Sequence, residues 1–338
     1  MQKKEGMKFT LNRVLLITVV VMISIGILTP TRGNTQKIYD DLFRAHFSTE
    51  KEGWVSGRWG CMLHTADGGK TWVRQNTGTD NTLSAVFFMD SKSGWAVGDM
   101  GTIIHTKDGG KTWEKQKSPV PFFHMKVRFV SPTKGWIVSE QSHILYTEDG
   151  GKNWAVQFKD LDIILKSLSF CDDLHGWAVG EYGFIYHTRD GGKRWEKQAG
   201  KYELSEKTGD VEGGNFLFDV VADTPQTVWA VGIEGYVIRT TNGGKSWQEI
   251  KTGAPKTQLF CVNTDRNGTI LVGGSGVFLV SQDGGKTWKT PEFKPSIIYD
   301  WIYGVSRRGK EGYMTVGGGG AIYLSENKSP LSWKKVDY

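Results

Sequence analysis

The sequence predicts an all-β protein, a seven-bladed β-propeller whose blades are four-stranded antiparallel sheets. The first observation is a short phrase that returns seven times and reads Thr-Lys-Asp-Gly-Gly-Lys-Thr-Trp in its clearest copy, residues 106–113. The second is the spacing of 41, 41, 41, 52, 41 and 45 residues between successive closing tryptophans, which are Trp72, Trp113, Trp154, Trp195, Trp247, Trp288 and, in a degenerate copy, Trp333. A unit of this length suits one propeller blade and exceeds most solenoid turns.

Each repeat contains four short segments that we expect to be strands. In the clearest repeat they are residues 83–88, 94–98, 101–106 and 112–116, which are rich in β-branched and aromatic side chains and bounded by Gly and Asp. This pattern is typical of antiparallel strands joined by tight turns. The second segment carries a Gly-Trp-x-Val phrase, whose Trp position holds Trp54, Trp95, Trp136, Trp177, Trp229, Ile270 and Met314. Twelve of the fourteen tryptophans therefore belong to the repeat, and Trp59 and Trp301 do not.

The Asp-Gly-Gly of the phrase predicts a turn between the third and fourth strands. An aspartate that opens a turn accepts backbone N–H groups from the residues that follow, and glycines supply positive φ angles. We expect this structural role, and not a catalytic one, for Asp67, Asp108, Asp149, Asp190, Asn242 and Asp283.

Residues 94–113 read Gly-Trp-Ala-Val-Gly-Asp-Met-Gly-Thr-Ile-Ile-His-Thr-Lys-Asp-Gly-Gly-Lys-Thr-Trp. This unit resembles the Asp-box (BNR) repeat of the bacterial neuraminidase type and, within it, the photosystem II stability/assembly factor family. The likeness extends across roughly residues 40–338. It implies a seven-bladed propeller, and the family's cyanobacterial members resemble assembly chaperones on the lumenal side of the thylakoid. The partners implied are protein subunits of a membrane complex, and a photosystem II-like client in a photosynthetic organism.

The first 33 residues differ in composition from the rest. A basic start, including Lys3 and Arg13, precedes an apolar run at 14–28, about 15 residues, which is short for a membrane span of roughly 20. We expect residues 1–33 to be a signal peptide, with an uncleaved signal anchor as the alternative, and residues 34–338 to be a single propeller domain. The protein is then exported, to the periplasm, the thylakoid lumen or the cell exterior.

The charge balance argues against nucleic-acid binding. Residues 1–33 hold five Lys/Arg and one acid, which is +4 of the formal +6 and leaves about +2 for the rest. We expect no cofactor and no metal. The cysteines, in different blades, form no disulfide or metal framework, and the histidines that recur at one position of the repeat also lie on different blades: Cys61, Cys171, Cys261, His64, His105 and His187.

The repeat also sorts the loops into two sets. With the first strand innermost and the strands alternating in direction, every Asp-box turn falls on one face of the ring, the Asp-box face. The turns between second and third strands and the connections between blades fall on the opposite one, which we call the upper face. Loops on a rigid scaffold carry most functional residues. We therefore place a candidate binding patch on the upper face, with Arg58, Trp59, Asp99, Glu140, Glu181, Tyr182 and Trp301.

Two interpretations remain open for this patch. Trp59 and Trp301 lie outside the repeat on blades that ring closure makes neighbours, and aromatic residues with Arg dominate binding hot spots; alternatively, they fill the seam. The acids Asp99, Glu140 and Glu181 occupy one position in three consecutive blades. They form either an acidic arc for a cationic partner or caps for their own hairpin turns.

Three further segments are of interest. Residues 199–214, which account for the 52-residue spacing, read as a mobile polar loop on the upper face. The inner strands place basic residues on one side of the central channel, namely Arg44, His46, Lys126 and Arg128. The Asp-box face carries a ring of repeated lysines that we interpret as a solvated rim: Lys70, Lys111, Lys152, Lys193, Lys245 and Lys286.

An enzyme is the main alternative function, because Asp-box propellers include sialidases and xyloglucanase-type glycosidases. The sequence contains no Arg-Ile-Pro, which a sialidase is expected to show. Asp99 and Glu140 are the acids that could provide the carboxyl separation of an inverting glycosidase, but they are periodic with the repeat, and xyloglucanases resemble two propellers in tandem. We therefore expect a non-enzymatic, exported, protein-binding scaffold. A glycoside hydrolase or a carbohydrate-binding propeller is the alternative.

Overall fold

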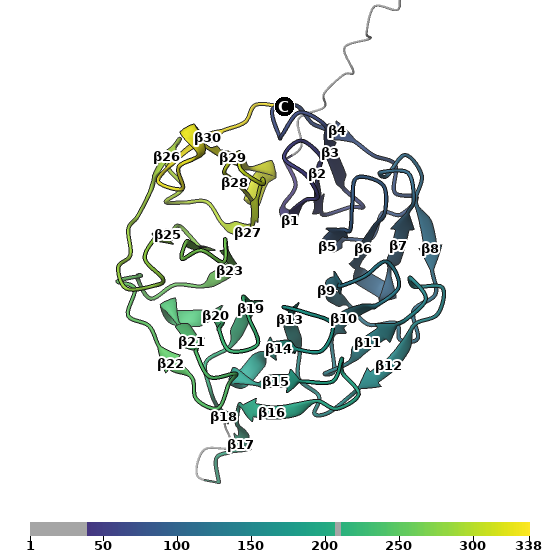
Figure 1. Cartoon of the computed structure of the whole chain (residues 1–338), viewed down its shortest axis with the longest axis vertical. Helices are drawn as coiled ribbons and strands as arrows, with labels where there is room; N and C mark the ends of the chain where they lie inside the picture. Colours follow the sequence, from purple (N-terminus) through teal and green to yellow (C-terminus); the bar gives the residue numbers. More distant parts are fainter. Residues whose placement is uncertain (1–38, 207–210) are drawn as a thin grey trace, which may run out of the picture. The chain divides into compact units, whose positions relative to one another are not determined.

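The computed structural model describes residues 39–206 and 211–338, which form seven blades around a central channel (Figure 1). The expected signal segment, residues 1–33, lies outside the described residues. Each blade, numbered 1 to 7 in chain order, begins with its inner strand. The inner strands are β1 (Leu42–Phe47), β5 (Leu83–Phe88), β9 (His124–Phe129), β13 (Leu165–Phe170), β19 (Leu217–Ala222), β23 (Leu259–Thr264) and β27 (Ile302–Arg307).

The remaining strands follow outward in chain order, each antiparallel to the one before. Second strands are β2 (Gly53–Gly57), β6 (Gly94–Gly98), β10 (Gly135–Ser139), β14 (Gly176–Gly180), β20 (Val228–Gly232), β24 (Ile270–Gly274) and β28 (Tyr313–Gly317). Third strands are β3 (Met62–Thr65), β7 (Ile103–Thr106), β11 (Ile144–Thr147), β15 (Ile185–Thr188), β21 (Val237–Thr240), β25 (Phe278–Ser281) and β29 (Ile322–Ser325). Outer strands are β4 (Val73–Arg74), β8 (Glu114–Gln116), β12 (Ala155–Phe158), β16 (Glu196–Ala199), β22 (Gln248–Glu249) and β30 (Ser332–Lys335).

The last two blades depart from the four-stranded pattern. In blade 6 the fourth strand is reduced to one bridge between Val280 and Lys289. The chain then passes to blade 7, where β26 (Glu292–Lys294) pairs in parallel with β30 and makes a fifth strand. The seven-bladed, all-β prediction is otherwise confirmed. Among residues 39–206 and 211–338, no helix has the length and apolarity that a membrane crossing requires.

The repeated Gly-Trp phrase packs blades 1, 2 and 3 against the blades that follow them. Trp54 of blade 1 lies flat on Phe88 of blade 2, with ring centroids 3.5 Å apart, and the indole is fully buried. Gly94 leaves space for the Phe88 ring, because a Cβ on residue 94 would lie 2.5 Å from Phe88 side-chain atoms. The same stack recurs with Trp95 on Phe129 at 3.6 Å. Burial of such large aromatic surfaces is the main apolar contribution between blades.

The Asp-box turn has the bonds that its sequence suggests. Asp108 accepts the backbone N–H of Thr112 at 2.9 Å and its hydroxyl at 2.7 Å, and the hydroxyl of Thr106 at 2.8 Å. These hydrogen bonds favour the ionised carboxylate and lower the pKa of Asp108 to about 2. The next two residues, Gly109 and Gly110, have φ angles of 77° and 85°, which glycine adopts at low cost.

The turn also binds the preceding blade. The carbonyl of Gly109 accepts a hydrogen bond from Gln75 Nε2 at 2.7 Å and from Trp54 Nε1 at 3.1 Å, both of blade 1. Six Asp-box turns receive such a bond through their first glycine; the other donor–acceptor pairs are Gln116–Gly150, Gln157–Gly191, Gln198–Gly243, Arg239–Gly284 and Arg308–Gly68. We call these the inter-blade bonds. They make the Asp-box a contact between blades as well as a turn.

Ring closure joins blade 7 to blade 1 without an exchange of strands. The inner strands β27 and β1 contact each other, as do all consecutive inner strands. Buried Arg308, on the turn after β27, donates to the carbonyl of Gly68 at 2.6 Å. On the upper side the backbone N–H of Gly319 of blade 7 donates to Asp41 Oδ1, at the entrance to β1, at 3.2 Å. Side-chain bonds and packing therefore close the ring.

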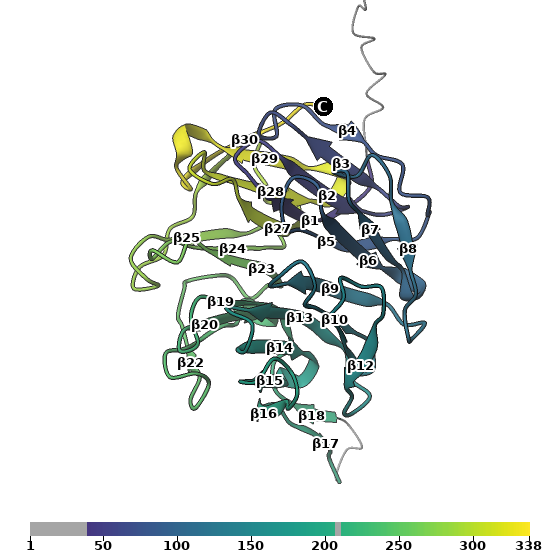
Figure 2. The same cartoon turned by 45° about the vertical axis from the view of Figure 1, so that its right-hand side comes forward.

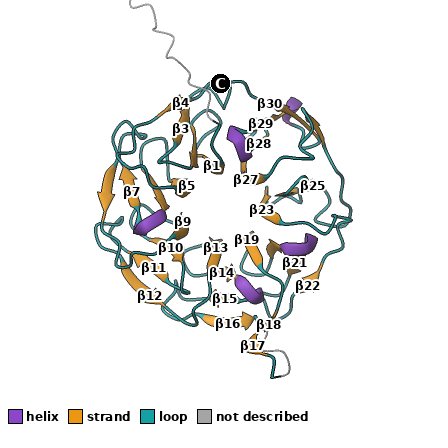
Figure 3. Ribbon diagram, turned by 180° about the vertical axis from the view of Figure 1, so that it is seen from behind, coloured by secondary structure: helices purple, strands orange, loops and turns teal. Residues whose placement is uncertain are grey.

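The face assignment follows from backbone bonds. Gly109 N donates to Lys92 O at 2.8 Å, which places the Asp-box turn beside the turn between the first and second strands. Arg58 N, in the turn between β2 and β3, instead donates to Asp41 O at the entrance to β1. Most upper-face turns contain a single 3-10 turn, drawn purple in Figure 3: η1 (Asp99–Gly101), η2 (Glu181–Gly183), η3 (Ile233–Gly235) and η4 (Gly318–Gly320). A fifth, η5 (Glu326–Lys328), lies between β29 and β30.

The insertion behind blade 4 differs from the expected loop. Its described residues pair as a hairpin of β17 (Tyr202–Leu204) and β18 (Val211–Gly213), which projects from the rim of the ring in Figure 2. Tyr182, in the upper turn of blade 4, packs edge-on against Tyr202 at 4.9 Å. Cross-strand pairing and this aromatic contact, which polar composition alone did not reveal, give the insertion its structure.

Gly110→Ala should destabilise the protein more than Gly78→Ala. Both glycines have positive φ, so both variants lose about 1–2 kcal/mol. At Gly110 a Cβ would also lie 2.0 Å from Gln75 Oε1 and displace an inter-blade bond, whereas nothing lies within 4 Å at Gly78. We expect about 1–3 kcal/mol of further loss at Gly110, measured by urea unfolding. Equal losses would contradict the contact role of the turn.

Arg308→Ala should loosen the closure of the ring. The guanidinium donates to Gly68 O, Tyr313 O and Glu311 O, so its removal leaves buried carbonyls without donors. We expect a loss of about 2–4 kcal/mol in the free energy of unfolding. The neighbouring Arg307 is exposed, and Arg307→Ala should cost less than about 1 kcal/mol. Similar losses for the two variants would contradict this account.

Candidate functional site

Exposed apolar side chains are concentrated on the upper face. Of the twelve large hydrophobic residues that are exposed in the described part of the chain, nine lie on upper-face loops or on the hairpin that leaves them. The nine are Tyr39, Trp59, Met100, Leu161, Tyr202, Leu204, Ile298, Tyr299 and Trp301. Leu174 lies on the Asp-box face, and Val73 and Val156 on outer strands. Such a gathering on one face of a propeller indicates a contact surface.

Trp59 stands at the tip of the upper turn of blade 1 in a backbone conformation that bulky residues avoid. Its φ is 53°, and its side chain is 62% exposed. The equivalent tip residues, Met100, Gln141, Tyr182 and Glu234, share this conformation, while blade 7 uses Gly319. A non-glycine residue costs about 1–2 kcal/mol in the left-handed region. Since this conformation recurs in the repeat, it is the exposure of a large indole at the tip that makes Trp59 a candidate for function.

Trp301 lies on the connection into blade 7 and is 50% exposed. It follows Ile298 and Tyr299, whose side chains are 64% and 94% exposed. Its ring meets Tyr303 edge-on at 5.9 Å, and Tyr303 lies 5.4 Å from Phe43 of blade 1. The exposed aromatic surface of blade 7 therefore continues onto blade 1.

Arg58 completes this surface on blade 1. Its guanidinium carbon lies 5.8 Å from the centre of the Phe43 ring, and its Nε donates to Asp41 at 2.9 Å. Phe43 and Tyr303 thus connect Arg58 to Trp301 across the seam of blades 7 and 1, and Trp59 follows Arg58 in the same upper turn; we call Arg58, Trp59 and Trp301 the seam patch. Trp59 and Trp301 leave much of their indoles in solvent and do not plug the seam.

The other predicted patch residues have local roles. Asp99 accepts the N–H of Met100 at 2.8 Å, Glu140 that of Phe123 at 3.1 Å, and Glu181 that of Ile164 at 3.0 Å. Each acid therefore ties its own upper loop, which favours the cap interpretation over an acidic arc. Tyr182 packs against the hairpin and against Phe216.

Sequence reasoning missed a row of aromatic side chains that follows part of the upper mouth of the channel. The second residue of every inner strand is a β-bulge, where the register with the second strand shifts. Bulges re-aim side chains at barrel and propeller rims. Four consecutive blades, 5, 6, 7 and 1, carry aromatic residues there, in contact along the row at 5.2–5.7 Å: Phe218, Phe260, Tyr303 and Phe43. The recurrence of aromatics at one strand position was the available signal.

The basic residues expected in the channel do line its cavity, but an acid neutralises two of them. Asp219 of blade 5 accepts bonds from Arg44 at 3.1 Å and Lys126 at 2.6 Å, and from Ser167 at 2.6 Å. Burial raises the pKa of Asp219, but the two cations outweigh it and bring the pKa to about 2. Sequence reasoning missed Asp219 because its partners come from blades 1 and 3, far away in the chain.

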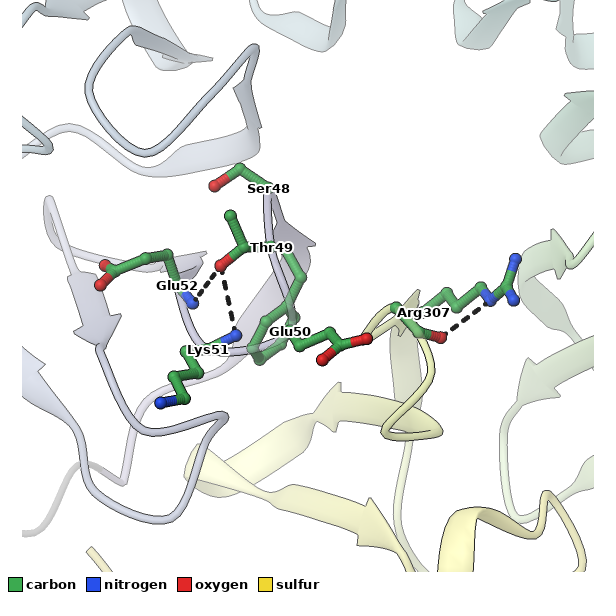
Figure 4. A pocket seen from close by; sticks show the side chains of 8 residues that line it. Ser48, Thr49, Glu50, Lys51, Glu52 and Arg307 are labelled. Carbon is green, nitrogen blue, oxygen red and sulfur yellow. Dashed lines mark hydrogen bonds between the residues drawn. The ribbon is translucent and has the colours of Figure 1, made fainter.

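A hollow lies on the Asp-box face between blades 1 and 7, with a volume of about 790 Å³ (Figure 4). Several of its polar groups are occupied locally, and the Ser48 hydroxyl is buried without a partner among the described residues. Thr49 Oγ1 accepts the N–H of Lys51 and of Glu52, Glu50 accepts the N–H of Lys310, and Arg307 donates to Gly309 O. No group of three or more His, Cys, Asp or Glu side chains suited to a metal occurs in the described ranges. This hollow offers no reactive constellation.

Comparison with known families now decides the identity. Three segments, residues 73–155, 120–208 and 201–337, match the family model described as "Photosynthesis system II assembly factor YCF48". Together they span well over half of the sequence. The chain belongs to this family. A search of the curated proteins found no match to the sequence.

Solved structures agree on the fold. "YCF48 bound to D1 peptide" is 19% identical, with a TM-score of 0.70 over 86% of this chain and 94% of that one. YCF48 from Cyanidioschyzon merolae is 21% identical, with a TM-score of 0.68 over 84% and 95%. The GH74 xyloglucanase from Xanthomonas campestris is 13% identical, also with 0.68, over 88% of this chain but 54% of the enzyme. At these identities the likeness concerns the fold alone.

Asp219→Asn should destabilise the protein and change its response to acid. The substitution leaves Arg44 and Lys126 without a counter-charge in the channel, at a cost of about 3 kcal/mol. Because the folded-state pKa lies below the ordinary value, the stabilisation is present above pH 3.8 and is lost as the pH falls towards 2. Unfolding curves from pH 7 to 2 should therefore converge for the two proteins. Exposed Asp80→Asn is the control, and a constant difference at all pH values would contradict the assignment.

Proposed function

We propose that this protein is an exported, non-enzymatic scaffold that binds protein subunits of a membrane complex, of the photosystem II type in a photosynthetic organism, and assists its assembly or stability. Membership of the assembly-factor family supports this role, as does the D1 peptide in one of the family's solved structures. A protein with this role would act in the periplasm or the thylakoid lumen, held at the membrane by its client or by an uncleaved signal anchor.

The observation that carries the proposal is the one-sided exposure of apolar side chains. The seam patch presents two tryptophans, Tyr299 and an arginine, which are the residue types that dominate protein interfaces. Trp59 is held there in a costly backbone conformation. Selection for stability alone would favour glycine at that tip, as in Gly319 of blade 7.

The absence of catalysis is part of the proposal. The acids that could serve an inverting glycosidase, Asp99 and Glu140, are engaged as caps of their own loops. A catalytic pair needs carboxyls free to face a substrate. The likeness to GH74 enzymes covers about half of their length. The enzyme alternative predicts glycan hydrolysis that Asp99→Asn abolishes, and detection of that activity would overturn the scaffold proposal.

The double variant Trp59→Gly, Trp301→Ala should lose client capture while keeping its stability. Glycine removes the exposed indole and relieves the left-handed strain, so the thermal midpoint should stay level or rise. Capture is measured by crosslinking in native membranes, followed by identification of the captured subunits. We expect at least about a tenfold loss, as for removal of interface hot spots.

The matched control is Val73→Ala with Leu174→Ala, which removes exposed apolar side chains away from the upper face. Its capture should equal that of the unaltered protein. Equal capture by the seam variant would refute the seam patch as the contact surface. Recovery of subunits unrelated to any membrane complex would refute the client class.

A further inference from the structure

A second polar cavity lies in the channel; the Asp219 cluster forms part of its lining, and the cavity extends from there towards the Asp-box face. Its volume is about 240 Å³, and it is lined by the inner strands of all seven blades. The residues that matter for its chemistry are His46, Arg128, Ser169, Asn263 and Arg266. The expected function uses the upper face and leaves this cavity unexplained.

Arg128, on β9, faces the cavity without a partner for its Nε atom, which is shielded from solvent. Its guanidinium is stacked over the ring of Phe87 at 4.9 Å. Burial, and then the charge of Arg266, lower the pKa of Arg128 to about 10, so it remains protonated at neutral pH. A shielded guanidinium with an unpaired N–H is a costly feature that a bound anion would relieve.

Arg266 reaches the same cavity from the turn between β23 and β24 of blade 6. Its φ is 63°, in a turn fixed by Asp265, which accepts the N–H groups of Asn267 at 2.7 Å and Thr269 at 2.9 Å. Within the described ranges, neither Arg266 nor Arg128 has a carboxylate within 4.0 Å of a guanidinium nitrogen. Two guanidinium groups from opposite blades thus face one cavity, close enough for the charge of Arg266 to lower the pKa of Arg128, and neither is held in a direct ion pair with a described residue; the charge of Arg266 also acts on Asp223.

The acids near this end of the channel are engaged elsewhere. Asp172 accepts the N–H groups of Leu174 and His175, and Asp173 lies 3.9 Å from Lys134. Asp223 accepts the hydroxyl of Thr264, and burial raises its pKa.

Two neutral groups can also serve a ligand. Ser169 Oγ accepts the N–H of Ala222 at 3.0 Å, which leaves its own hydrogen available as a donor. His46 Nε2 donates to the carbonyl of Phe88 at 2.8 Å, and burial followed by the Arg128 charge lowers its pKa to about 4. His46 is therefore uncharged at neutral pH and contributes no third cation.

We infer that this cavity binds a small oxyanion carrying two negative charges, held between Arg128 and Arg266 with the Ser169 hydroxyl as a further donor. Guanidinium groups donate paired N–H bonds that match carboxylate and phosphate oxygens. Two such groups select a dianion over a monoanion, because each charge of the ligand then meets one cation. The ligand is either a phosphate-type ion or a short dicarboxylate, and both share this chemistry.

Calorimetric titration of the purified full chain at low ionic strength tests the inference. The probes are hydrogen phosphate, sulfate, malonate and, as the monoanion, acetate. At least one dianion should bind at one site per chain and at least about tenfold more tightly than acetate, and its identity distinguishes the phosphate-type from the dicarboxylate ligand. Arg128→Gln and Arg266→Gln should each weaken that binding by at least about tenfold.

Arg194→Gln is the matched control, because it removes one positive charge from the exposed Asp-box face. It should change the affinity less than about twofold. If Arg128→Gln fails to fold, Arg266→Gln, in an exposed turn, decides alone. A second readout is the His46 ring observed by NMR, since a bound dianion should raise its pKa. Absence of saturable dianion binding, equal binding of acetate, or equal loss in Arg194→Gln would overturn the inference.

Discussion

The inter-blade bond is the interaction on which the rest of the structure depends. The first glycine of each of six Asp-box turns offers its carbonyl to a side chain of the preceding blade, as Gly109 does to Gln75. The aspartate shapes the turn so that this carbonyl points outward, and positive φ at the glycines leaves room for the donor. Stacked Trp–Phe pairs then add apolar contact at the same junction. Six of the seven junctions are bonded in this way, and the pairing of β26 with β30 joins the chain leaving blade 6 to blade 7, so seven marginal sheets become one stable ring.

The two faces of the ring therefore have different roles. The Asp-box face is occupied by turns whose polar groups are already satisfied, so its sequence is constrained by the repeat. The upper-face turns instead bond to the connection into the next blade through backbone N–H groups, as Gly60 does to Asn81 O at 3.0 Å. Because these bonds use no side chain, the tips can carry Trp59 or Met100, and loops of this kind are where recognition can arise.

The central channel differs from both faces because it contains buried charged side chains. Asp219 joins cations from blades 1 and 3, so the charge cluster couples blades that do not touch. Such a cluster contributes little net stability compared with apolar packing, but breaking it is costly, and it selects one register of the inner strands. Nearer the Asp-box face, Arg128 and Arg266 have no carboxylate of the described residues in a direct ion pair. This contrast with the paired cations Arg44 and Lys126 is the observation that indicates an anionic ligand.

Periodicity in the chain was enough to predict the blade count, the strand order, the Asp-box turns and their shared face, because each of these depends on local chemistry repeated about every 41 residues. Trp59 and Trp301 were identified for the same reason, as tryptophans that the repeat does not explain. The bonds between distant residues were not accessible in this way. At the closing junction Arg308, on the turn after β27, takes the place of the glutamine donor. Asp219 bonds to partners that lie 175 and 93 residues away in the chain. The capping roles of Asp99, Glu140 and Glu181 depend on loop geometry. Only the closed ring determines which long side chain donates to which carbonyl. Closure brings together residues that are far apart in the chain, and no sequence pattern marks them as partners.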